Sequence, residues 1–262
     1  MASLNARAQT LGVPCHIQGI PFEAGTQVFF GLSDELVLCV LPRDQVISGV
    51  PCAEGLVHFH PTGQLAQCTL AVEHAERGVT LSRGTALSWN EDGTLTATLT
   101  APHTFAGVTV PAGASLRFDE AGRLTNWSRR LPVEEVIGGI PCQAGSVVTC
   151  FADGRPERVT LAMSHVVDGI TCMGGTDVEL HATGRLAVAT LGEAMEILSI
   201  RFEIGTELVF RPDGSLSVAQ LIEDMDIAGR HYTDGTYLLF DESGHLTESA
   251  AITWEVMRPT VT

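Results

Sequence analysis

A repeat of about thirty residues runs through this 262-residue chain and constrains its fold more than any single residue does. The two clearest copies read GIPCQAGSVVTCFADGRPERVTL from Gly139 and GITCMGGTDVELHATGRLAVATL from Gly169. Equivalent segments begin at the following residues, which gives eight repeats: Gly19, Gly49, Gly78, Gly107, Ser199 and Gly229. Similarity at a fixed period is typical of repeat proteins, in which each repeat buries its apolar face against its neighbours.

The repeat covers nearly the whole sequence, so we expect a single domain over residues 1–262. Residues 1–18 would form an N-terminal tail and cap, and residues 19–246 the eight repeats. Residues 247–262 would form a C-terminal strand and tail, in which Ile252, Trp254 and Val256 alternate with other residues. That strand would either close the array or pair with a second chain, so both a monomer and a dimer are compatible with the sequence.

Each repeat has the pattern of short strands separated by turns. Counted from its leading residue, every repeat has an apolar side chain at position +3 and glycine at position +6, and seven of the eight have an apolar side chain at position +9. Alternation of apolar residues at +1 and +3, and again at +9 and +11, predicts two strands. Segments such as PTG at 61–63 and PDG at 212–214 follow, and they favour a type I turn closed by a left-handed glycine. A third strand completes the repeat, so the fold is predicted to be all-β.

Two all-β architectures fit this pattern. One is a β-solenoid with three short strands in each coil, and the other is an extended array of antiparallel hairpins. The turn residues favour hairpins. The apolar inward positions, which recur at the same place in successive repeats, favour a solenoid. The sequence leaves both open.

The hairpin rhythm resembles that of MORN-like repeats of bacterial proteins. The segments that carry the resemblance are Phe210–Leu216, which reads FRPDGSL, and Phe240–Leu246, which reads FDESGHL. This resemblance implies a binding scaffold and assigns no catalytic residue.

The charge and the cysteine content restrict the partners and the compartment. The chain has 31 acidic residues and 15 Lys and Arg, for a net charge of −16, which argues against nucleic acid and anionic membranes as partners. Its first eleven residues have no apolar core of a secretory signal, and its seven cysteines form no CxxC pair. We therefore expect a cytoplasmic protein whose partner is another protein or a small apolar molecule.

The candidate site residues are polar side chains in a register that is otherwise apolar or mixed. The register four residues before each leading residue holds His74, His103, Glu135 and His165 in four successive repeats. Two imidazoles and one carboxylate bind divalent transition metals, so His103, Glu135 and His165 are a candidate metal set. In a solenoid these positions would be about 4.8 Å apart, but in a hairpin array they would be about twice as far apart, which is too far for one ion.

Two other interpretations of this register need no metal. Glu135 would act as a general base beside a histidine acting as the acid, or the four side chains would form a solvated stack beside a bend. A separate pair, His58 and His60, stands at positions +9 and +11, which are inward positions in other repeats. This pair is either half of a metal site or part of a repeat near an open end.

Two functions follow from these alternatives. The first is a β-repeat scaffold or binding module that presents an extended surface to a partner or a small ligand. The second is a cytoplasmic enzyme that performs His/Glu acid–base chemistry, with or without a metal. Its reaction would be a cyclisation, isomerisation, elimination or hydrolysis of a small apolar substrate. The cofactor is accordingly none or a divalent transition metal.

Overall fold

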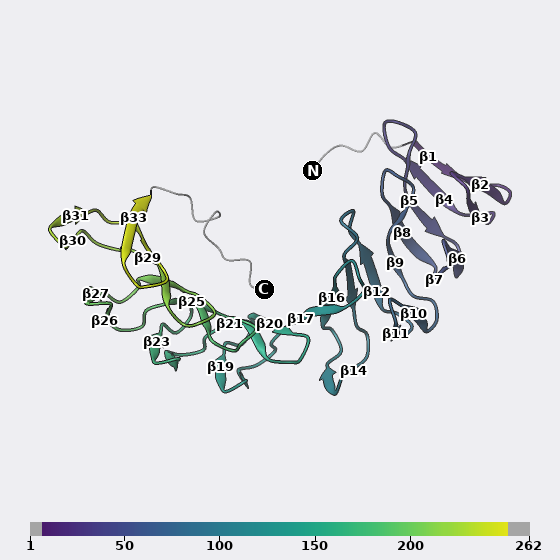
Figure 1. Cartoon of the computed structure of the whole chain (residues 1–262). Helices are drawn as coiled ribbons and strands as arrows, with labels where there is room; N and C mark the ends of the chain where they lie inside the picture. Colours follow the sequence, from purple (N-terminus) through teal and green to yellow (C-terminus); the bar gives the residue numbers. More distant parts are fainter. Residues whose placement is uncertain (1–6, 251–262) are drawn as a thin grey trace. The chain divides into compact units, whose positions relative to one another are not determined.

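The computed structural model describes residues 7–250, in which longer strands alternate along the chain with hairpins of three-residue strands (Figure 1). The register of each described strand pair is antiparallel, and successive long strands pair side by side. The fold is therefore all-β, as predicted, and it is the extended array of hairpins. The solenoid alternative is wrong, because the strands of neighbouring coils in a solenoid pair in parallel. No helix long and apolar enough to cross a membrane occurs in residues 7–250.

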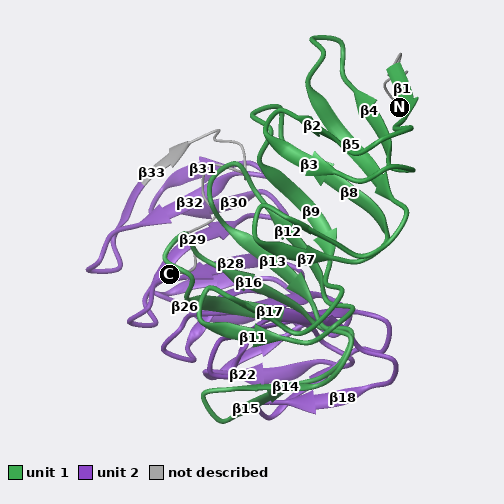
Figure 2. Ribbon diagram, turned by 90° about the vertical axis from the view of Figure 1, so that its right-hand side faces the viewer, with its two compact units in different colours: residues 1–127 green, residues 128–262 purple. Residues whose placement is uncertain are grey.

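The chain divides into two compact units, residues 1–127 and residues 128–262, which Figure 2 shows in separate colours. Strand β17 (Leu124–Arg130) contains the boundary. Unit 1 has these long strands: β1 (Arg7–Thr10), β4 (Gln27–Phe30), β5 (Leu36–Leu41), β8 (Gly55–Phe59), β9 (Leu65–Thr69), β12 (Ala86–Trp89), β13 (Leu95–Thr98) and β16 (Ser115–Phe118). Its short hairpins are β2–β3 (Cys15–Ile17 and Ile20–Phe22), β6–β7 (Gln45–Ile47 and Val50–Cys52), β10–β11 (His74–Glu76 and Val79–Leu81) and β14–β15 (His103–Phe105 and Val108–Val110).

Unit 2 repeats the same order of elements. Its long strands are β20 (Val147–Phe151), β21 (Pro156–Thr160), β24 (Asp177–Leu180), β25 (Leu186–Thr190), β28 (Glu207–Phe210), β29 (Leu216–Gln220), β32 (Tyr237–Phe240) and β33 (Leu246–Ala250). Its short hairpins are β18–β19 (Glu135–Ile137 and Ile140–Cys142), β22–β23 (His165–Val167 and Ile170–Cys172), β26–β27 (Met195–Ile197 and Ile200–Phe202) and β30–β31 (Met225–Ile227 and Arg230–Tyr232).

The short hairpins are closed by two-residue turns in which both residues have positive φ. In β22–β23 these residues are Asp168 (φ 52°) and Gly169 (φ 82°). Positive φ at both central positions defines a type I′ turn, whose twist matches that of the flanking strands. The leading residue of each repeat is thus the second residue of this turn, which explains why seven of the eight are glycine.

The long hairpins turn as their sequences predict. In β28–β29 the N–H of Gly214 donates to the carbonyl of Arg211 at 2.8 Å, and the N–H of Arg211 donates to the carbonyl of Ser215 at 2.9 Å. Gly214 has a φ of 89°, and the strand register shifts beside it, as in a type I turn followed by a bulge.

The core of each unit is built from the inner side chains of the long strands and of the short hairpins, and from a leucine at the end of every second long strand. Leu191 is fully buried, and its N–H donates to the carbonyl of Thr206 at 2.9 Å. The carbonyl of Leu191 accepts from the N–H of Gly205 at 2.8 Å, and Gly205 has a φ of 94°. This pairing explains the glycine at position +6, and burial of such a leucine stabilises the fold by about 2–3 kcal/mol.

Both ends of the described chain are long strands paired in antiparallel fashion, β1 with β4 and β33 with β32. β1 pairs with β4 from Arg7↔Phe30 to Thr10↔Gln27, so the N-terminal segment begins the sheet as a strand. The predicted C-terminal residues Ile252, Trp254 and Val256 lie outside the described residues.

Candidate functional site

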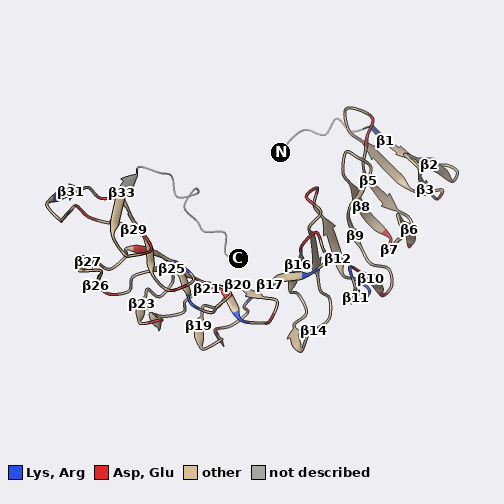
Figure 3. Cartoon of the chain, in the orientation of Figure 1, with Lys and Arg blue, Asp and Glu red and all other residues tan. Residues whose placement is uncertain are grey.

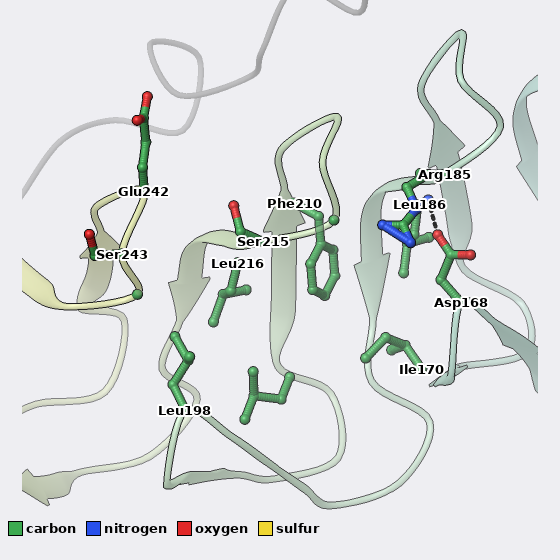
Figure 4. Close-up of a pocket in the computed structure, with 13 residues that line it drawn as sticks. Asp168, Ile170, Arg185, Leu186, Leu198, Phe210, Ser215, Leu216, Glu242 and Ser243 are labelled. Carbon is green, nitrogen blue, oxygen red and sulfur yellow. Dashed lines mark hydrogen bonds between the residues drawn. The ribbon is translucent and has the colours of Figure 1, made fainter.

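A row of clefts lies where the turns of the short hairpins meet the turns of the long hairpins. The first cleft, in unit 2, has a volume of about 380 Å³. Figure 4 shows its lining side chains, which come from β22–β23, β26–β27 and the turns of three successive long hairpins. The size falls within the range of small-molecule sites, so this is the candidate binding site.

The floor of the first cleft is apolar and its rim is polar. The apolar side chains are Ile170, Leu186, Ile197, Leu198, Phe210 and Leu216. Leu186, Phe210 and Leu216 are buried, so they form the floor. Asp168, Arg185, Ser215, Glu242 and Ser243 supply the polar groups. Such a cleft suits an apolar group with a small polar end.

Two rim side chains are held by the backbone of long-hairpin residues. Asp168 Oδ2 accepts a hydrogen bond from the N–H of Leu186 at 2.8 Å, which connects a short-hairpin turn to the start of β25. Arg185 Nη1 donates to the carbonyl of Asp213 at 2.7 Å, which connects two long-hairpin turns. These bonds hold the two side chains in place at the rim of the cleft.

The turn of β26–β27 is unusual and lines this cleft. Its two residues are Leu198 (φ 55°) and Ser199 (φ 61°), so neither left-handed position is glycine. A left-handed residue with a side chain costs about 1–2 kcal/mol relative to the ordinary helical conformation. Leu198 is 48% exposed and lies against Gly244 in the turn of β32–β33. The unusual turn thus positions an apolar side chain over the cleft.

The same cleft recurs one repeat earlier in unit 2. There Gly138, Ile140, Arg155 and Pro156 stand where Asp168, Ile170, Arg185 and Leu186 stand in the first cleft. Its volume is about 340 Å³. The recurrence shows that the clefts are a property of the repeat.

Unit 1 has a cleft at the equivalent place, with a more polar lining. Arg77, the first residue of the β10–β11 turn, donates to the carbonyls of Gly93 at 2.6 Å and Asp119 at 2.5 Å. His60 Nε2 donates to the carbonyl of Trp89 at 2.8 Å, and its Nδ1 lies 3.8 Å from Glu91 Oε1. The lining residues of this cleft are therefore largely committed to bonds within the protein.

The His/Glu register faces inward, and its members are spread over four short hairpins. Each of the four residues begins a different short hairpin: His74 and His103 in unit 1, Glu135 and His165 in unit 2. Within each unit, successive repeats add two strands to the array, so positions repeat about every 9.6 Å along it. The single-metal set of His103, Glu135 and His165 was predicted for the solenoid spacing, which the hairpin array does not have. Among residues 7–250, no group of three His, Cys, Asp or Glu side chains is arranged to hold a metal ion.

Glu135 is neutralised by an arginine from the preceding strand. Arg129 Nη1 and Nη2 lie 3.0 and 2.5 Å from the two carboxylate oxygens of Glu135, in a bidentate pair. These hydrogen bonds lower the pKa of Glu135 below its usual range. A general base needs a pKa raised toward neutrality, so this environment is opposite to that of the predicted base.

The three histidines of the register have local partners. His74 Nε2 lies 3.6 Å from Glu76 Oε2, and the His103 ring packs against Phe105 with centroids 4.4 Å apart. His165 lines the second cleft of unit 2. Only His165 of the four therefore lies at a cleft.

The inward placement of His58 and His60 is wrong, because this repeat is one residue shorter than the others before its turn. Val57 and Phe59 occupy the buried positions of β8, and His58 points to the opposite face. His60 opens the turn, with its N–H donating to the carbonyl of Gln64, and is equivalent to Asn90 in the next repeat. The two imidazoles therefore do not form an inward pair.

The sequence reasoning missed the residues that shape the clefts. Asp168, Leu198 and Arg77 each occupy the first position of a type I′ turn, one residue before the leading residue of the repeat. A sequence signal existed for Asp168, because the dipeptide Asp-Gly at 168–169 favours a two-residue hairpin turn, whereas Leu-Ser at 198–199 carries no such signal.

Neither models of known protein families nor curated proteins match this chain. The resemblance to MORN-like repeats stays a prediction.

Proposed function

We propose that the protein is a non-enzymatic binding module and that the first cleft of unit 2 binds a small, mostly apolar molecule. The observation that carries this proposal is the cleft of about 380 Å³ with an apolar floor and a polar rim. Its recurrence one repeat earlier supports a surface on which the repeat supplies the binding position and single residues tune it.

The chemistry of the rim supports a ligand with a polar end. Arg185 and Ser243 supply donors at the mouth, while Asp168 is already engaged by a backbone N–H. The acid–base alternative has less support, because the candidate base Glu135 is held ionised by Arg129.

The test is a titration of the neutral dye Nile red, followed by its fluorescence. We expect saturable binding to the native protein and about tenfold weaker binding to Leu198→Asn, because burial of a leucine side chain contributes about 1.5–3 kcal/mol and about 1.4 kcal/mol is a tenfold change in affinity. Asparagine tolerates the left-handed conformation, so this variant keeps the turn. The matched control is Leu32→Asn, because Leu32 is 90% exposed at the turn of β4–β5 and lines none of these clefts.

Methyl NMR spectra locate the dye directly. Binding should shift the methyl signals of Ile170 and Ile197, both of which line the cleft. Equal dye binding by the Leu198 and Leu32 variants, or unchanged isoleucine signals at saturation, would refute the proposal.

A further inference from the structure

The short hairpins of unit 2 have a second face, opposite the side chains of Ile170 and Ile197 that line the first cleft, and one of its residues, Val166, also borders the second cleft. In β26–β27, Ile197 lines the first cleft, and Glu196, its neighbour in the strand, is exposed. Side chains alternate between the two faces of a strand, so the residue pairs Val136↔Pro141, Val166↔Thr171 and Glu196↔Arg201 share the outer face. We call this face of unit 2 the outer strip.

The first half of the outer strip is apolar and exposed. Val136 is 71% exposed and Val166 is 59% exposed, at equivalent positions of two successive hairpins. Val133 and Met163, which precede these hairpins, are also exposed. The carbonyl of Pro141 accepts from the N–H of Ala162 at 2.9 Å, so the first hairpin is joined to the segment that carries Met163.

The second half of the outer strip carries an excess of acidic side chains. Arg201 and His231 lie opposite Glu196 and Asp226 on the same face, and His231 Nδ1 lies 2.9 Å from Asp226 Oδ1. The Thr171 hydroxyl donates to the carboxylate of Glu193, which connects the apolar half directly to the next hairpin. Glu196 follows on β26, and Glu223 and Asp226 stand at the equivalent positions of β30–β31. Figure 3 shows acidic residues along these last two hairpins.

The spacing of the hairpins defines the shape of a matching partner. Each repeat adds two strands to the long sheet, so the hairpins repeat about every 9.6 Å along it. A polyproline II helix rises about 9.3 Å per turn of three residues, so its residues i, i+3, i+6 and i+9 share one face at nearly this spacing. Four such residues match the four hairpins of the outer strip.

We propose that the outer strip binds a polyproline II segment whose successive i, i+3, i+6 and i+9 residues are apolar, apolar, basic and basic. The apolar residues would lie on Val136 and Val166, and the basic residues on Glu196 and Asp226. Charge complementarity fixes the class of partner, because an acidic or neutral segment would gain nothing from the second half of the strip. The Val46 hairpin in unit 1 is followed by Thr and Ala positions and offers no such acidic half.

The test uses the fluorescein-labelled peptide LPSLPSRPSR and fluorescence anisotropy. We expect saturable binding that weakens as the salt concentration rises, since exposed ion pairs are screened. The peptide LPSLPSEPSE, with glutamate for arginine, and the permuted peptide LLPPSSRRPS should each bind about tenfold more weakly or worse. Equal binding of the three peptides would overturn the proposal, as would no binding of the first.

Variants locate the binding on the protein. Val136→Arg combined with Val166→Arg should weaken binding by about tenfold or more, and so should Glu193→Lys combined with Glu196→Lys. Val46→Arg is the matched control, because Val46 is 58% exposed at the equivalent position of β6–β7. Binding that is unaffected by the unit 2 variants would overturn the proposal. Nile red binding to the cleft should survive these changes, so failure here and failure of the proposed function are distinguishable.

Discussion

Replacing Ser199 by glycine should stabilise the protein, although serine is the native residue. Ser199 is the second residue of the β26–β27 turn and has a φ of 61°, a conformation that glycine adopts freely. The equivalent residue of the neighbouring β22–β23 hairpin, Gly169, has open space where a Cβ would stand. The cost at Ser199 therefore comes from its backbone conformation and not from crowding.

The magnitude follows from two opposing effects. Relief of a left-handed residue is worth about 1–2 kcal/mol. The greater freedom of glycine in the unfolded chain removes about 0.5–1 kcal/mol of that gain. The free energy of unfolding should therefore rise by about 0.5–1 kcal/mol on Ser199→Gly, which corresponds to roughly 1–3 °C in Tm.

Urea denaturation followed by circular dichroism measures this change, with the slope of the transition checked for constancy. Ser33→Gly is the control, because Ser33 is exposed in a turn of β4–β5 and does not have positive φ. It should leave stability unchanged or lower it by up to about 1 kcal/mol. A Ser199→Gly variant that is no more stable than the native protein would refute the reasoning.

Three further predictions concern single side chains. Arg77→Met removes two hydrogen bonds to carbonyl groups and should lower the free energy of unfolding by about 2 kcal/mol in urea denaturation, whereas Arg83→Met, at an exposed position, should change it by less than about 0.5 kcal/mol. Arg129→Met should return the lowered pKa of Glu135 toward its usual range in an NMR titration. With Arg129 present, the stabilisation by this pair exists above the unfolded pKa of the carboxyl and is lost as the pH falls through its lowered folded pKa. Burial raises the pKa of the Cys150 thiol to about 12, so it should react with Ellman's reagent at pH 8 only after unfolding.

The repeat and most of its strands could be predicted from the sequence, because their signals are local. The turn residues at 212–214 specify a left-handed glycine, and the structure has it at Gly214. The recurring inward-facing apolar residues could not decide between a solenoid and a hairpin array, because side chains alternate along a strand in the same way in both. The two-residue turn at 168–169 carries the deciding information, because a type I′ turn joins antiparallel strands directly.

The histidine pair shows how a count along a repeat can fail. The repeat that begins at Gly49 has one residue fewer between its leading glycine and its turn than the other repeats have. A position counted from the leading glycine is therefore displaced by one residue in this repeat. Because the side-chain period of a strand is two, a shift of one residue moves a side chain to the other face. Counting backward from the turn glycine, Gly63, gives the correct result, with His60 at the turn and Phe59 inside.

The candidate site was harder to predict, for a different reason. A register connects equivalent residues of different repeats, but the strongest partner of Glu135 is Arg129, which comes from the preceding long strand and shares no register with it. Such a contact depends on how the chain bends between the long strand and the short hairpin. Equivalence between repeats therefore identifies the inward-facing residues but not the side chains that each of them contacts.

The structure separates two kinds of constraint on the short hairpins. Their inner residues pack on the core or line the clefts, so their size and polarity are set by neighbours in the same unit. Their turn and outer residues are free of the core, and this is where the repeats of unit 2 differ most, with Leu198 over one cleft and Val136 and Glu196 on the outer strip. A left-handed leucine lowers stability where asparagine or glycine would not, and backbone strain of this kind is typical of functional sites. Binding by this protein is therefore best sought at residues that the repeat itself does not require.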